Sequence, residues 1–145
     1  MTKVFINPGH APNGDPDPGA CNAETGLRES DVAAIVGRMV AGYLNAAGMK
    51  TEVLQSDSLE DICSAANESA ADLFVSIHCN SAGSSEASGT EVCVHPDSAV
   101  GHSLGQAIQD QIVSSLETVD RGLKERVPGV NGLYVLNNTS MPAVL

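Results

Sequence analysis

Short apolar runs alternate along this chain with longer segments whose apolar residues recur every three or four positions. The runs predict strands over residues 3–7, 51–55, 73–77 and 90–95. The periodic segments predict helices over residues 32–47, 58–66 and 104–116. Strands that alternate with helices are typical of an α/β domain. We therefore expect a three-layer fold, in which a mostly parallel central sheet carries helices on both faces.

The two earlier helices have clear sequence signals. The first carries the stripe of an amphipathic helix and ends at Gly48; its stripe consists of Val32, Ile35, Val36, Met39, Val40, Tyr43, Leu44 and Ala47. In the second, Ser58 and Asp61 resemble a capping box. The residues expected to face inward from this helix are Leu59, Ile62, Cys63 and Ala66. The continuous apolar run over 73–77 suits a strand that is covered on both faces, near the centre of the sheet.

The remaining segments are shorter. We expect a flexible connection over residues 81–89, an ordered surface loop over 120–132, and a short strand over 133–136. A further strand begins at residues 143–145, where the chain stops inside an apolar run. We therefore expect residues 1–145 to form one domain that lacks its C-terminal strand and helix.

Composition excludes several classes of partner. The chain has 7 basic and 18 acidic residues, a formal net charge of −11, which disfavours binding to nucleic acid. No apolar run is long enough to span a bilayer, and the N-terminus has no signal-peptide pattern. Its four cysteines lack the Cys-x-x-Cys spacing of zinc knuckles and redox sites. Cys63 and Cys93 are expected to be small buried apolar residues.

Three residues stand where an α/β fold places a binding site. His10 follows the first strand in a long Pro- and Gly-rich loop, Glu29 begins the first long helix, and His78 ends the central strand. Two imidazoles and a carboxylate can bind zinc and leave a fourth position for water. Each also has a simpler explanation: a solvated loop histidine, a helix N-terminal carboxylate, or a strand-end histidine bonded to backbone. His95 and His102 are rival donors.

Six segments in order resemble the zinc-dependent N-acetylmuramoyl-L-alanine amidases of the peptidoglycan amidase type 3 family. They are VFINPGH, GLRESDVA, ADLFVSIHCN, GTEV, DRGLKE and YVLNNTSMPAVL. The resemblance implies a zinc-peptidase-like fold and hydrolysis of the amide between N-acetylmuramic acid and L-alanine. It implies that the zinc ligands are His10, Glu29 and His78. It also implies supporting, substrate-binding roles for Asn80, Glu91, Arg121 and Lys124.

Two departures from the family pattern affect these expectations. Ala11 begins a Pro-rich insertion where the family has a glycine, which should reshape one wall of the groove. In similar proteins the MPAVL run continues into a strand that bears the catalytic glutamate, so we expect that residue to lie beyond Leu145. Glu24 is a conceivable substitute. The activity of the 145-residue form is therefore in question.

Three functions remain in competition at this point. The first is a zinc amidase that acts as a monomer on peptidoglycan at the cell wall, whether secreted, periplasmic or released by a phage. The second is a catalytically impaired, zinc-containing peptidoglycan-binding module. The third is a flavodoxin-like domain for a small ligand, which would bind no zinc.

Overall fold

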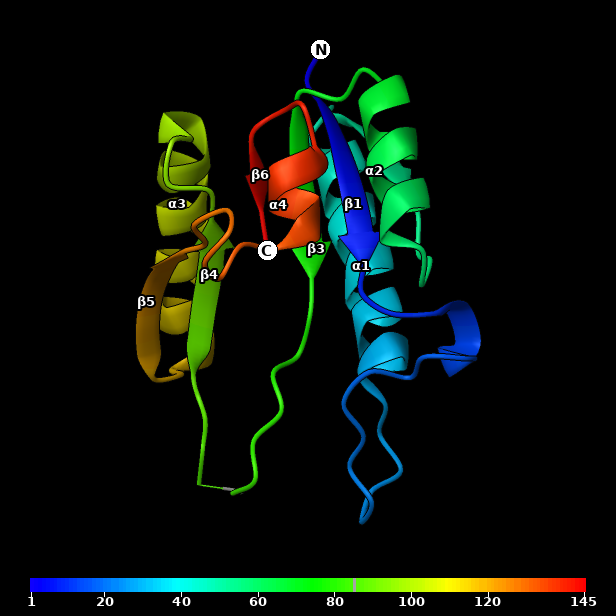
Figure 1. Ribbon diagram of the computed structural model, residues 1–145, viewed down its shortest axis with the longest axis vertical. Coiled ribbons are helices and arrows are strands. Elements are labelled where there is room, and N and C mark those ends of the chain that lie inside the picture. Colours follow the sequence, from blue (N-terminus) through cyan, green and yellow to red (C-terminus); the bar gives the residue numbers. More distant parts are fainter. Residues whose placement is uncertain (85) are drawn as a thin grey trace.

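The structure is a computed structural model that describes residues 1–84 and 86–145. Its centre is a six-stranded sheet with the order β2-β1-β3-β6-β4-β5 (Figure 1). The strands are β1 (Lys3–Pro8), β2 (Lys50–Val53), β3 (Leu73–Ile77), β4 (Thr90–Val94), β5 (Asp120–Glu125) and β6 (Ala143–Val144). Strands β2, β1, β3 and β6 run parallel, whereas β4 is antiparallel to β6 and β5 is parallel to β4. The expected α/β fold with a mostly parallel sheet is confirmed.

Helices cover both faces of the sheet, as expected. They are η1 (Pro12–Gly14), α1 (Glu29–Ala46), α2 (Leu59–Glu68), α3 (Ala99–Leu116) and α4 (Tyr134–Asn138). Helices α1 and α3 lie on one face, and α2 and α4 lie on the other (Figure 1). The sheet is therefore the middle one of three layers.

The central strands provide most of the core. Phe5 of β1 and Phe74 of β3 are fully buried, and their rings stack with centroids 5.8 Å apart on the face beneath α2 and α4. The predicted cap of α2 is present, because the Ser58 side chain accepts a hydrogen bond from the Asp61 backbone N–H. Cys63 and Cys93 are buried within the same cluster, as predicted. Leu59 is the exception, since it is 48% exposed.

Two expectations near the C-terminus are wrong. Residues 133–136 do not form a strand: helix α4 begins at Tyr134 and buries Val135 and Leu136. A four-residue apolar run has too few positions for its period to separate helix from strand. The expected surface loop contains strand β5. Its sequence, DRGLKE, is mostly charged and lacks the apolar run by which the other strands were predicted. Charged residues are common on edge strands such as β5 because they block pairing with other chains.

Helix α1 has the predicted position, but only part of its predicted apolar stripe packs on the sheet: Val40 and Leu44 contact the core, whereas other large residues are exposed. Ile35, Met39 and Tyr43 are 52%, 55% and 73% exposed. The buried positions instead include three small residues: Ala33, Gly37 and Ala41. The helix lies so close to β1 that a Cβ at Gly37 would come within 2.6 Å of the Pro8 Cγ. Close approach, rather than side-chain size, therefore decides which face of α1 is buried.

No helix in the described residues is long and apolar enough to cross a membrane. The expected flexible connection over residues 81–89 includes Ser85, which lies outside the described residues.

The packing of the two faces can be tested with one buried and one exposed aromatic residue. Phe74→Ala should lower the free energy of unfolding by about 3–5 kcal/mol, because it removes a fully buried ring. Tyr43→Ala should change it by no more than about 0.5 kcal/mol, because that side chain lies on the surface. Urea denaturation followed by circular dichroism gives both values. A similar loss in the two variants would contradict the observed orientation of α1.

Candidate metal centre

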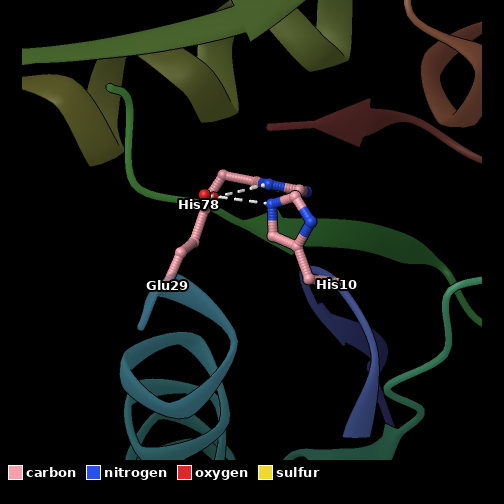
Figure 2. Close-up of side chains that lie close together, drawn as sticks. All are labelled: His10, Glu29 and His78. Atoms are coloured by element: carbon pink, nitrogen blue, oxygen red, sulfur yellow. Dashed lines mark hydrogen bonds and ion pairs between the residues drawn. The ribbon is translucent and has the colours of Figure 1, made fainter. Parts of the chain in front are cut away.

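The topology of the sheet brings the three predicted metal ligands together. His10 follows β1, Glu29 is the first residue of α1, and His78 follows β3 (Figure 2). Strands β1 and β3 are parallel neighbours, so their carboxyl ends meet at one edge of the sheet. The N-terminus of α1 reaches the same edge. Residues that are 68 positions apart in the sequence thereby share one site.

The ligand atoms of these residues lie within 4.8 Å of one another. Glu29 is the centre of the cluster: its Oε2 is 3.0 Å from His10 Nε2, and its Oε1 is 2.9 Å from His78 Nδ1. The two imidazole rings meet edge to face, with centroids 4.9 Å apart. In the described residues this is the only group of His, Cys, Asp or Glu side chains that meets the spacing of a metal site.

The Glu29 carboxylate is held in place by the backbone. It is buried and accepts hydrogen bonds from the N–H groups of Ala20 (2.9 Å) and Cys79 (2.7 Å). Burial alone raises the pKa of Glu29, but these two N–H donors and the nearby His10 outweigh it, so the net pKa is lowered. The carboxylate is consequently ionised at neutral pH and available to a cation.

The two histidines have different surroundings. Burial lowers the pKa of His10, but the hydrogen bond to Asp17 and the charge of Glu29 outweigh it and leave the pKa raised. Burial is the dominant effect on His78 and lowers its pKa despite the hydrogen bond to Glu29. His78 is therefore neutral at pH 7, the form in which imidazole binds metals.

Asp17 fixes the orientation of the His10 ring. Its Oδ2 lies 2.7 Å from His10 Nδ1, and its Oδ1 accepts the Gly19 N–H at 2.9 Å. A carboxylate at Nδ1 favours the tautomer with the proton on that nitrogen, which leaves the Nε2 lone pair directed at the site. Sequence analysis missed Asp17, because nothing in its loop sequence separates it from Asp15.

Two glycines allow the side chains to approach so closely. A Cβ at Gly9 would come within 2.4 Å of the His78 ring. A Cβ at Gly19 would come within 2.5 Å of the His10 ring and 2.7 Å of Glu29 Oε2. His10 itself has a φ of 66°, a left-handed conformation uncommon for residues other than glycine. The loop after β1 is thus shaped around the cluster.

The donor set fits zinc. Neutral imidazole nitrogen and carboxylate oxygen are its common ligands, and three protein ligands leave a position for water or substrate. Two ligands of a tetrahedral zinc ion lie roughly 3.3 Å apart, given metal–ligand distances of about 2.0–2.1 Å. The observed Glu29–histidine separations of 2.9 and 3.0 Å are close to this value, and all three ligand atoms lie within 4.8 Å of one another.

A cavity of about 320 Å³ opens beside the cluster, on the face of the sheet covered by α2 and α4. His10, His78 and Asp17 contribute polar groups to its wall. Its apolar lining includes Leu59, Ile62, Leu133, Val135 and Leu145. The partly exposed position of Leu59 is explained by this cavity. The site therefore has room for a substrate next to the metal ligands.

The predicted supporting residues form a second group at the same edge of the sheet. Glu91 of β4 accepts a hydrogen bond from Arg121 Nε at 3.0 Å, and this bond is the main reason that its pKa is lowered. Asn80 and Lys124 lie close enough to lower the pKa of Glu91 further. Arg126 Nη2 also lies 3.6 Å from Glu91, a contact that sequence analysis did not anticipate.

The rival donors lie elsewhere. His95 follows β4 and lines a hollow at the opposite edge of the sheet, together with Asp97 and Ser98. His102 is in α3, where its Nε2 is 3.1 Å from Glu125. Glu24 is exposed in the turn of the loop before α1 and does not line the cavity.

Comparison with known proteins identifies the family. Residues 4–145 match the family model described as N-acetylmuramoyl-L-alanine amidase, and the chain belongs to this family. It is 40% identical over 148 residues to the uncharacterized protein YqiI of Bacillus subtilis (98% of this chain, 66% of YqiI). It is 34% identical over 148 residues to the N-acetylmuramoyl-L-alanine amidase LytC of the same organism (98% of this chain, 28% of LytC). The chain thus spans less than two thirds of the length of these curated relatives.

A solved structure agrees with the sequence relatives. The N-acetylmuramoyl-L-alanine amidase from Clostridium difficile 630 superimposes with a TM-score of 0.83 at 32% identity, over 99% of this chain and 77% of that one. The similarity therefore includes the whole three-layer architecture described above.

The glycine requirement of the site can be tested with a matched pair. Gly19→Ala should abolish zinc binding, because the new Cβ would collide with His10 and Glu29. Gly26→Ala is the control: Gly26 also has a positive φ, of 74°, but no atom lies within 4 Å of the position of its Cβ. Zinc content after dialysis, measured by mass spectrometry, should be near zero for the first variant and unchanged for the second. Retention of zinc by both would argue against the observed geometry.

The role of Asp17 can be tested with an isosteric change. Asp17→Asn keeps the oxygen that accepts the Gly19 N–H but replaces the one that faces His10 with an NH₂ group. The new NH₂ group and the N–H at Nδ1 of His10 are both hydrogen-bond donors, so the bond that orients the ring would be lost. We therefore expect zinc affinity to fall about 10–100-fold. Asp15→Asn, in the same loop, should leave it unchanged. Competition with a chromogenic chelator gives the affinities, and equal values would rule out the orienting role.

Proposed function

We propose that this chain hydrolyses the amide bond between N-acetylmuramic acid and L-alanine in peptidoglycan, with zinc as its cofactor. The observation that carries the proposal is the convergence of His10, Glu29 and His78 at one edge of the sheet, beside a cavity, in a chain of the amidase family. A small-ligand domain without metal would have no use for a buried carboxylate between two imidazoles. We further propose that residues 1–145 form one domain that acts as a monomer.

Each of the three proposed ligands would contribute differently to metal binding. Glu29 supplies the negative charge, and its fixed position between two backbone N–H groups sets the place of the ion. His78 supplies a neutral nitrogen, and His10 supplies a second one oriented by Asp17. When bound at such a site, zinc polarises the scissile carbonyl and makes water a stronger nucleophile at neutral pH.

A general base is also needed: it would accept a proton from the attacking water and deliver it to the leaving alanine nitrogen, because an amide nitrogen leaves poorly unless it is protonated. We propose that a glutamate at position 147 would supply this base in a form of the chain that continues past Leu145. The geometry of β6 supports this proposal. Strand β6 is parallel to β3 with Val75 opposite Val144, so the same register would put position 147 opposite His78. Side chains alternate between faces, so position 147 would share the face of Leu145, which lines the cavity.

The site of action follows from the substrate. We propose that the protein works at the bacterial cell wall, on peptidoglycan, and that nucleic acid is not a partner, given the net charge of −11. The alternative function, a zinc-containing peptidoglycan-binding module without activity, is not favoured, because the family and its named relatives are amidases.

Zinc dependence can be tested by replacing one ligand. His78→Ala should lose bound zinc, with a circular dichroism spectrum like that of the parent, because the ring lies at the end of a strand outside the main core. His95→Ala is the matched control, since His95 ends β4 at the opposite edge of the sheet. Zinc content and thermal unfolding should be measured for all three proteins. Equal zinc in the His78→Ala variant and the parent would contradict the proposed site.

Hydrolysis can be tested on purified cell walls by counting newly exposed L-alanine amino groups. We expect the 145-residue form to be slower by about 10²–10⁴-fold than a longer form that carries a glutamate at position 147. Glu→Gln at that position in the longer form should restore the slow rate. Equal rates for the short and long forms would contradict the proposed base. Zinc binding without any cleavage by either form would favour the binding module.

A further inference from the structure

Strand β5 separates its charges between the two faces of the sheet. Asp120 accepts a hydrogen bond from Gln109 of α3 at 2.6 Å, and Glu125 lies 3.1 Å from His102 of α3. Both acidic side chains are therefore engaged with α3. The basic side chains of the same segment are Arg121, Lys124 and Arg126. Arg121 and Arg126 instead contact Glu91 of β4.

The pairing of β5 with β4 places these basic residues on the face opposite α3. Val92 and Val94 point toward α3, so Glu91 and Cys93 between them point the other way. Lys124 is paired with Cys93, and Arg126 Nε donates a hydrogen bond to the Cys93 sulfur at 3.2 Å. In the part of the chain that the structure describes, α4 lies in front of β6 and β3, and no helix lies over this face of β5 (Figure 1).

The result is a cationic strip, defined by Arg121, Lys124 and Arg126, on a strongly acidic protein. The strip contains three of the chain's seven basic residues and one carboxylate, Glu91, which leaves a net charge of about +2. Lys124 has no acidic partner within 4.0 Å among the described residues. Glu91 forms ion pairs with both arginines, and its side chain is only 14% exposed. The arginine N–H groups are therefore already positioned to donate to a second carboxylate, from a ligand.

The strip begins with Arg121 at the metal edge of the sheet and runs along β5 to Arg126, whose side chain reaches back to Glu91. Strand β4 is antiparallel to β6, so its first residues lie at the edge where β3 ends and His78 stands. Asn80, two positions after His78, is a neighbour of Glu91. A substrate placed across the metal could therefore extend over the cavity beneath α2 and α4 in one direction and over the cationic strip in the other.

We propose that the cationic strip binds a free carboxylate of the stem peptide, on the alanine side of the scissile amide. This inference rests on the proposed function, because it assumes a muramoyl-peptide at the metal. The N-acetylated sugars of the glycan are uncharged, whereas the stem peptide carries carboxylates. Elsewhere the protein's own negative charge repels such groups, so the strip would orient the substrate with its peptide over β4 and β5.

The experiment compares two peptides that differ by one charge. L-Alanyl-D-glutamine has a free α-carboxylate on its second residue, and L-alanyl-D-glutamine amide has an amide there. The γ-carboxyl group is an amide in both peptides, as it is in the stem peptide. Binding of each to the zinc-loaded protein is followed by nuclear magnetic resonance, through the backbone amides of β4 and β5. We expect the free acid to bind about threefold to tenfold more tightly, and added salt to reduce that preference.

Two variants locate the effect. Lys124→Gln removes a cation without leaving an ion-pair partner behind, and Arg126→Gln removes a second cation. Each should bring the ratio of the two affinities closer to one. Arg38→Gln, on the exposed surface of α1 near the other end of the sheet, is the matched control and should leave the ratio unchanged. Thermal unfolding of each variant checks that the fold is intact.

Equal affinity of the parent for the two peptides would overturn the inference, as would a preference that persists in both variants. Neither result would affect the proposed function, which is tested separately by zinc content and by wall cleavage. Conversely, loss of the proposed function would show in those assays, because the peptide measurement involves no bond cleavage.

Discussion

The parallel pairing of β1 with β3 is the contact on which the rest of the site depends. It aligns the ends of two strands, so that His10 and His78 leave the sheet side by side, and it buries Phe5 against Phe74 behind them. The Glu29 carboxylate then enters between the imidazoles, held by two backbone N–H groups from separate loops. The centrally packed pair of strands thus positions His10 and His78, and the backbone N–H groups position Glu29 between them.

The loop after β1 completes the arrangement by allowing close approach. Gly9 and Gly19 lack the Cβ atoms that would collide with the histidine rings, and His10 adopts a left-handed backbone conformation. Asp17 in the same loop fixes the ring orientation of His10. The Pro-rich loop that begins at Ala11 therefore supplies both Gly19 and the orienting carboxylate of Asp17.

The antiparallel strand β4 gives the site its asymmetry. Because β4 and β5 run against the other strands, their first residues arrive at the metal edge and bring Glu91 and Arg121 with them, and Arg126 reaches back to Glu91 from the far end of β5. One side of the metal centre is then a partly apolar cavity and the other a cationic strip. Such a division suits a substrate with an uncharged sugar at one end and an acidic peptide at the other.

The order of apolar runs and helical segments was enough to predict the α/β architecture, and local pattern predicted the cap at Ser58. Family motifs pointed to His10, Glu29 and His78, which the structure brings together. Strand β5, helix α4 and the exposed part of the α1 stripe could not be predicted in this way. Their states depend on which neighbour each segment meets: Val135 packs under α2, and Gly37 lies against Pro8. Likewise, the sequence identifies His10, Glu29 and His78 as candidate ligands. The distances among them and the contact of Asp17 with His10 depend on the tertiary structure, because they require distant segments to pack together.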